Sequence, residues 1–190
     1  MTLFDCLNEM RNHGGEARTR GLADEIITKF AELDPKLEEA VLAAHEAFEE
    51  LLEQEPELLA MDEASQAAAI QEGYVNFYAD DAVNPYVSLA ARGPWIVTVK
   101  GAVLYDVGGY GMIGAGHAPQ AVLEAMNKPH VMANIMTPNL SQKRLAESLR
   151  NEIGHTRGSC PFAKFLFINS GSVSVTVAAR LSDINAKIMT

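Results

Sequence analysis

One stretch decides the expected fold: Phe165-Leu166-Phe167-Ile168-Asn169-Ser170-Gly171-Ser172. Its first four residues form an apolar run bounded by polar residues, which predicts a buried parallel strand. It ends in a turn of small residues, Ser170-Gly171-Ser172. Where a helix follows such a turn, unpaired backbone N–H groups and the positive end of the helix dipole meet, and glycine lets a ligand approach the backbone. The stretch therefore predicts a phosphate-binding turn, with a simple N-cap role for Ser172 as the alternative.

The segment after this turn has two periodicities. Val173, Val175 and Val177 alternate as in a strand, whereas four apolar residues recur at helical spacing: Val177, Leu181, Ile184 and Ile188. The helical stripe is the longer of the two, and Ala178-Ala179 favours a helix. The order strand, turn, helix predicts an α/β fold.

Residues 84–153 contain a predicted β-hairpin, a glycine-rich segment and two short helices. Asn84-Pro85 marks a turn, and residues 95–99 and 102–105 are predicted to pair through a turn at Lys100-Gly101. Glycines then gather at positions that indicate positive φ angles or close backbone approach, namely Gly108, Gly109, Gly111, Gly114 and Gly116. The helices are expected over Pro119–Lys128 and Leu140–Ile153.

The first 83 residues predict a set of acidic helices. Residues 22–54 have helical periodicity, with a new helix start at Asp34-Pro35, because Asp is a favourable N-cap and Pro suits the first turn. An apolar stripe follows at helical spacing: Leu37, Val41, Ala44, Phe48 and Leu51. Asp62 is expected to cap a further short helix that ends at Gly73. The stripe is interpreted as a packing face, with a dimer-forming or domain-covering role as the alternative.

Composition and charge exclude several classes of protein. Apolar residues make up 48% of the chain, which is enough for a core. Residues 1–83 carry 20 acids and 5 bases, whereas residues 84–190 carry 5 acids and 10 bases, a distribution that argues against a nucleic-acid partner.

No apolar run is long enough to span a membrane, and Met1–Asn12 does not have the pattern of a signal peptide. Cys6 and Cys160 form no metal-binding or disulfide pattern, and the five histidines show no metal spacing, so we expect a cytoplasmic protein without a metal site.

Four segments together resemble the class III, fold-type I aminotransferases that depend on pyridoxal 5'-phosphate (PLP). They are Arg92-Gly93 with the hairpin ending in Tyr105-Asp106, the run from Gly109 to His117, the helix from Pro119, and Phe167 to Ser172 with Ala178-Ala179-Arg180 behind it. The resemblance covers residues 84–190 and implies the N-terminal part of that fold. It divides the chain into an acidic helical extension, residues 1–83, and an incomplete aminotransferase segment, residues 84–190. That segment would hold part of the small domain and the first strand and helix of a large domain whose complete sheet is mainly parallel.

The resemblance also implies roles for individual residues. Gly171 and Ser172 match the positions that hold the PLP phosphate, and Ser170 would support the turn. Tyr110 falls in the segment that borders the substrate cavity, and His117 is interpreted as a residue that orients the loop. Val173 departs from the family, which usually has an acidic or polar residue there, and so does Thr98, where many relatives carry Asp.

The same resemblance implies transamination between an amine or amino acid and a 2-oxo acid, in a homodimer. The Schiff-base lysine and the acid that pairs with the pyridine nitrogen lie further downstream in the family, so the 190-residue chain by itself is expected to be inactive. Two alternatives remain open. One is a non-catalytic helical interaction module centred on residues 22–72. The other is an α/β domain that binds a nucleotide phosphate, which the absence of GxxxxGK[ST] and of a well-placed GxGxxG disfavours. An Asp-Glu-Val segment and a following lysine in the reading frame beyond Thr190 would decide for the aminotransferase.

Overall fold

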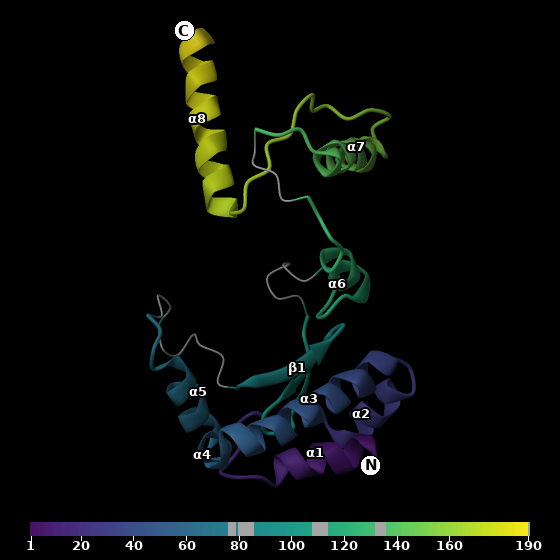
Figure 1. Cartoon of the computed structure of the whole chain (residues 1–190), viewed down its shortest axis with the longest axis vertical. Coiled ribbons are helices and arrows are strands. Elements are labelled where there is room, and N and C mark those ends of the chain that lie inside the picture. The colour runs from purple at the N-terminus through teal and green to yellow at the C-terminus, as the bar shows by residue number, and fades with distance from the viewer. Residues whose placement is uncertain (76–78, 80–85, 108–113, 132–135, 190) are drawn as a thin grey trace. The chain divides into compact units, whose positions relative to one another are not determined.

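The computed structural model describes residues 1–75, 79, 86–107, 114–131 and 136–189. The chain forms two compact units, Met1–Lys128 and Pro129–Thr190 (Figure 1). The first unit contains helices α1 to α6 and the three strands of a sheet, and the second contains helices α7 and α8. The protein is therefore a mixed α and β structure, as the sequence predicted at the coarsest level. The units divide after Lys128, whereas the division at residues 83 and 84 came from family resemblance and stays a prediction.

The first unit begins with α1, Leu3–Arg11, a helix that the sequence analysis did not predict. Thr2 and Asp5 form a capping box, in which the Thr2 hydroxyl accepts from the Asp5 amide and the Asp5 carboxylate accepts from the Thr2 amide. This pair satisfies two of the backbone donors that a helix start leaves open. Cys6, Leu7 and Met10 are buried on its inner face. The signal was present in the sequence as Thr2 followed three residues later by an acid.

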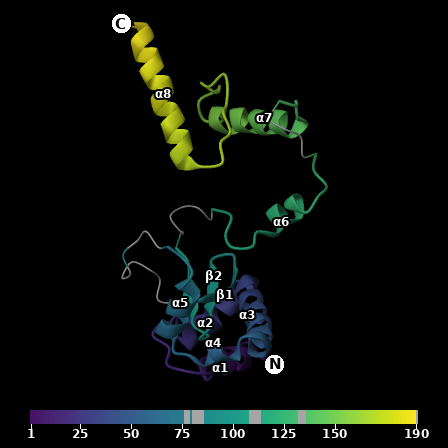
Figure 2. The ribbon, with the colours of Figure 1, turned by 60° about the vertical axis from the view of Figure 1, so that its left-hand side comes forward.

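The predicted helical front is confirmed, including its internal break. Helices α2, Asp24–Ala31, and α3, Pro35–Gln54, are separated at Asp34, whose side chain caps α3. Two shorter helices follow, α4, Pro56–Ala60, and α5, Glu63–Gln71, and Asp62 caps α5 as predicted. The stripe on α3 is a packing face, because Leu37, Val41, Ala44 and Phe48 are all buried. The sheet lies on one side of α3 and α1 lies on another, as the two ribbon views both show (Figures 1 and 2).

The sheet has three antiparallel strands in the order β1, Ser88–Arg92, β2, Trp95–Thr98, and β3, Val103–Tyr105. Strands β2 and β3 are the predicted hairpin, with Trp95 opposite Tyr105 and Val97 opposite Val103. Gly101 lies in its turn with φ +67°, a conformation that side-chain-bearing residues rarely adopt. Strand β1 was not predicted, since only its pairing with β2 distinguishes this stretch from a loop.

Two side chains fasten the sheet to the helices. The indole of Trp95 is 1% exposed and donates to Oδ2 of Asp34 at 2.8 Å, while Oδ1 of Asp34 accepts from the amide of Lys36 at 3.1 Å. Lys100 is 3% exposed, and its ammonium donates to the carbonyls of His13, Leu59 and Met61. Burial lowers the pKa of Lys100, and the nearby carboxylates of Asp62 and Glu63 oppose that shift.

Asp34 therefore has two structural roles, and its removal should cost more than the loss of a helix cap. We expect Asp34→Ala to lower the free energy of unfolding of the first unit by about 2–3 kcal/mol, because it removes the cap and leaves the buried indole N–H without its acceptor. Urea unfolding followed by the fluorescence of Trp95, the single tryptophan, measures this loss. Asp62→Ala is the control, since it removes a similar cap at α5 that serves no indole, and it should cost less. A loss of only about 1 kcal/mol for Asp34→Ala, the cost of a cap alone, would show that the bond between Asp34 and Trp95 contributes little.

The second unit consists of α7, Leu140–Gly154, and α8, Gly171–Met189, with α6, Gln120–Met126, preceding it in the first unit. All three helices lie where helices were expected, and α8 resolves the ambiguous periodicity after the turn in favour of a helix. The prediction of a buried strand at Phe165–Ile168 is wrong. These residues form no strand, and Leu166 and Phe167 are 67% and 45% exposed. A strand requires a hydrogen-bonding neighbour, and the described part of this unit contains no strand that could pair with it.

Candidate functional site

The first candidate site is the N-terminal end of α8, where the predicted phosphate-binding turn lies. The helix begins at Gly171, and the amide of Ser174 donates to the carbonyl of Ser170 at 3.0 Å. The amides of Gly171, Ser172 and Val173 precede that bond, so they have no partner within the helix. These three donors and the positive end of the helix dipole point in the same direction.

The role of Ser172 as an N-cap is excluded by where the helix starts. Ser172 lies inside the first turn of α8, and its carbonyl accepts from the hydroxyl of Thr176 at 3.0 Å. Ser170, which directly precedes the helix, is the residue in the capping position. The hydroxyl of Ser174 donates to the carbonyl of Ser170 at 2.9 Å. The capping residue is therefore Ser170, two residues before Ser172.

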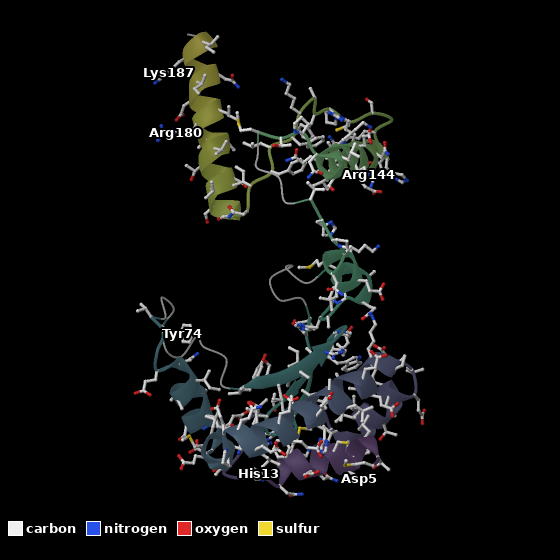
Figure 3. The ribbon with its side chains drawn as sticks, in the orientation of Figure 1. Asp5, His13, Tyr74, Arg144, Arg180 and Lys187 are labelled. Atoms are coloured by element: carbon white, nitrogen blue, oxygen red, sulfur yellow. The ribbon has the colours of Figure 1, made fainter. Side chains whose placement is uncertain are left out.

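Gly171 is not required by the packing of the chain. A Cβ atom placed on it would meet nothing within 4 Å, and its φ angle lies outside the left-handed region. Glycine here leaves the backbone amide open to the outside of the molecule. No acidic residue lies in the first turn of α8 to compete with an anion. Arg180 and Lys187 project from α8 further along the helix and not at its start (Figure 3).

This end of α8 can hold a phosphate group but cannot supply the rest of a PLP site. The residues present fit the phosphate, because free amides and a glycine without a blocking side chain are what such a group contacts. Isolated at a surface, the interaction of an anion with a helix dipole contributes about 0.3–1 kcal/mol. Strong binding therefore requires further contacts to the remainder of the cofactor.

The second candidate site is a corner of the first unit where the backbones of Gly93 and His117 pair. The amide of Gly93 donates to the carbonyl of His117 at 2.9 Å, and the amide of His117 donates to the carbonyl of Gly93 at 2.7 Å. Gly116 has φ +76°, and a Cβ atom there would lie 2.9 Å from Cα of Gly93. Only glycine fits at this close approach, which explains the Gly-His pair in physical terms.

His117 is held in a way that suits an orienting residue. Its Nε2 lies 3.0 Å from Oδ2 of Asp106, and the amide of Asp106 donates to the carbonyl of Pro94 at 2.8 Å. The side chain thus ties the end of β3 to the segment that follows the glycine-rich stretch. This geometry is what the interpretation of His117 as a loop-orienting residue requires.

An open cavity of about 530 Å³ borders this corner. Its described lining consists of Lys36 from α3, Gly93 and Pro94, residues 105–107 and residues 114–116. The volume is within the range that small-molecule sites occupy. The contribution of Lys36 was not foreseen, because sequence analysis had assigned the acidic helices to a separate extension. Tyr110, predicted to border the substrate cavity, lies outside the described residues, as do Gly108, Gly109 and Gly111.

The structure does not assign a catalytic role to Lys100, its most deeply buried lysine in the described residues. All three hydrogens of its ammonium can be directed at backbone carbonyls, the closest being that of Met61 at 2.7 Å. A lysine held this way joins α1, α4 and the β2–β3 turn and is not free to react. In the described ranges no cluster of His, Cys, Asp or Glu side chains could hold a metal ion, and no helix has the length and apolarity needed to cross a membrane.

Comparisons with protein-family models, with curated protein sequences and with solved structures found no match for this chain. The resemblance to class III aminotransferases therefore rests on the motifs in the sequence.

Proposed function

We propose that this chain is part of a PLP-dependent aminotransferase of class III, which transfers an amino group between an amine or amino acid and a 2-oxo acid. In this assignment Gly171 and Ser172 hold the phosphate of PLP through their backbone amides, and Ser170 supports the turn. Bound PLP would act as an electron sink that makes proton removal from the amino donor feasible. The Schiff-base lysine and the partner of the pyridine nitrogen would come from elsewhere in the protein.

One observation carries this proposal: the start of α8 is an unobstructed set of backbone donors at the position that the family resemblance selects. Neither part of the argument depends on the other. The family resemblance was assigned from four segments of the sequence, of which residues 167–172 are one, and the open approach at Gly171 is a feature of the structure. A further point of support is the corner at Gly93 and His117, where the glycines and the histidine of the motif have packing roles.

The packing of α3 weakens the alternative of a helical interaction module. Such a module needs its apolar stripe exposed for a partner, yet the stripe on α3 is covered by α1, β1 and β2 within the same unit. The nucleotide-binding alternative shares the phosphate chemistry of the α8 turn. It differs from the aminotransferase proposal because it predicts that no amino donor is required for function.

The expected activity is PLP-dependent amino transfer in a preparation that contains this chain together with the segment that supplies the lysine. Formation of amino acid from a 2-oxo acid should be detectable with at least one member of a panel of amines and amino acids, and it should disappear when PLP is removed. The 190-residue chain by itself should show none. Turnover by the chain alone would contradict the assignment of the lysine to another segment. A PLP-loaded complete protein inactive across a broad panel would contradict the proposed function.

A further inference from the structure

A separate cavity of about 240 Å³ in the first unit collects basic side chains. It lies between α1, the loop before α2 and the turn between β2 and β3. Arg11, Arg20 and Lys100 line it together with Thr19, and none of its described lining residues is acidic. Such a grouping of bases without acids in the lining is unusual in a chain with 25 acids, 15 bases and a net charge of −10.

Two of the three cations are fixed in place by the fold. Nε of Arg11 donates to the carbonyl of Gly101 at 3.1 Å, and its NH1 lies 2.9 Å from a carboxylate oxygen of Asp24. Lys100 is held by its three backbone carbonyls, which are neutral, so no carboxylate contacts its charge directly. Both positive charges are therefore positioned before any ligand arrives, which reduces the ordering that binding requires. Lys100 acts on a ligand through its charge and not as a hydrogen-bond donor, because its hydrogens are directed at the carbonyls.

The third cation, Arg20, is exposed and forms no ion pair with any carboxylate in the described ranges. The acids that face this region are Asp24, which contacts Arg11, Glu63, which accepts from the amides of Arg18 and Thr19 at 2.7 Å each, and Asp62, whose carboxylate lies near Lys100. Arg11 thus has Asp24 beside it and Lys100 has Asp62 and Glu63 nearby, whereas Arg20 is the cation of this cavity without an ion pair in the described ranges. The guanidinium of Arg20 is free to meet a ligand with the paired donors that suit a phosphate or carboxylate group.

Thr19 supplies an independent observation. Its hydroxyl oxygen is buried and has no hydrogen-bond partner among the described residues, and the residue lines the same cavity. A buried hydroxyl without a partner destabilises a fold, so such groups mark places where a partner is missing. An anion in this cavity would accept from that hydroxyl.

We propose that the cavity formed by Arg11, Thr19, Arg20 and Lys100 binds a small oxyanion of the phosphate class. The group could be free phosphate or the phosphoryl group of a metabolite, and the chemistry of recognition is the same. This site is distinct in its residues from the turn at the start of α8, and it does not depend on the proposed aminotransferase function.

The test titrates the 190-residue chain with inorganic phosphate at constant ionic strength, with chloride replaced as phosphate is added. Binding should raise the midpoint of thermal unfolding reported by Trp95 and should shift the backbone amide resonances of residues 17–20 and 100–102. Arg20→Gln should weaken phosphate binding at least about tenfold, since it removes a charge-assisted hydrogen bond. Arg18→Gln is the matched control, because Arg18 lies in the same loop and does not line the cavity. It should leave the affinity nearly unchanged.

Thr19→Val provides a second readout. It should raise the unfolding midpoint without phosphate, because an unsatisfied hydroxyl is removed, and it should reduce the further rise that phosphate causes. Replacing inorganic phosphate with a phosphorylated sugar separates the two ligand sources, and tighter binding of the sugar phosphate would favour a metabolite. Equal weakening by Arg20→Gln and Arg18→Gln would overturn the proposal. So would a phosphate response confined to the amides of residues 171–173.

Discussion

Replacing Gly101 with valine is expected to lower the free energy of unfolding of the Met1–Lys128 unit by about 4 kcal/mol, the largest loss of stability among the substitutions considered. Two effects act together. The φ angle of +67° is strained for any residue with a Cβ atom, and that atom would lie 2.7 Å from the carbonyl oxygen of Leu7 in α1. The oxygen belongs to the backbone of a packed helix, so it cannot move without separating α1 from the hairpin.

The fluorescence of Trp95 during urea unfolding measures this loss, because the indole is buried in the same unit. Gly73→Val is the matched control. A Cβ atom at Gly73 would meet nothing within 4 Å, and the residue has no positive φ. It should leave the unfolding midpoint nearly unchanged. A Gly101→Val protein as stable as the parent would mean that the turn between β2 and β3 does not pack against α1.

Replacing Gly171 with valine should lower the affinity of the complete protein for PLP by about a hundredfold. The valine side chain would cover the amides at the start of α8 and replace charge-assisted contacts to the phosphate, each of which contributes about 1.5–3 kcal/mol. Ser172→Ala should have a much smaller effect, because it keeps the backbone donor. Equilibrium dialysis against PLP, followed by absorbance, measures both changes.

The interpretation of this variant is simple because the fold does not need the glycine. Gly171 has open space around it, so the substitution should not unfold the chain. Gly73→Val again serves as the control, since it introduces the same side chain at another open position. A Gly171→Val protein that folds and binds PLP as tightly as the parent would show that the turn does not hold the phosphate.

Local signals were sufficient to predict several elements correctly. Asp34-Pro35 marks the start of α3 because capping and proline geometry act within one turn. The hairpin was recognisable because β-forming residues flank a glycine at which a positive φ was needed. Helix α8 was recovered from the longer of two competing periodicities. In each case the determining interactions lie within a few residues of one another.

The misses share a different cause. Strand β1 is defined by its pairing with β2, and the cavity beside Gly93 includes Lys36 from a helix almost 60 positions earlier in the chain. Pairing and packing between distant segments cannot be read from local patterns. The apolar run Phe165–Ile168 shows the converse, since its composition suits a strand while the described residues around it contain no partner. The cavity of Arg11, Arg20 and Lys100 was missed for the same reason, because three separate segments build it.

The most direct test of the central claim follows the backbone amides of residues 171–173 by NMR in the complete protein, which includes the lysine-bearing segment, during titration with pyridoxine 5'-phosphate. This analogue carries the phosphate of PLP but has no aldehyde to react with surface lysines. If the start of α8 is the phosphate end of a PLP site, the resonances of Gly171, Ser172 and Val173 should shift together with one dissociation constant. Pyridoxine without the phosphate should leave them unmoved, and Gly171→Val should abolish the shifts. Unchanged resonances at these three residues at saturating analogue would contradict the account.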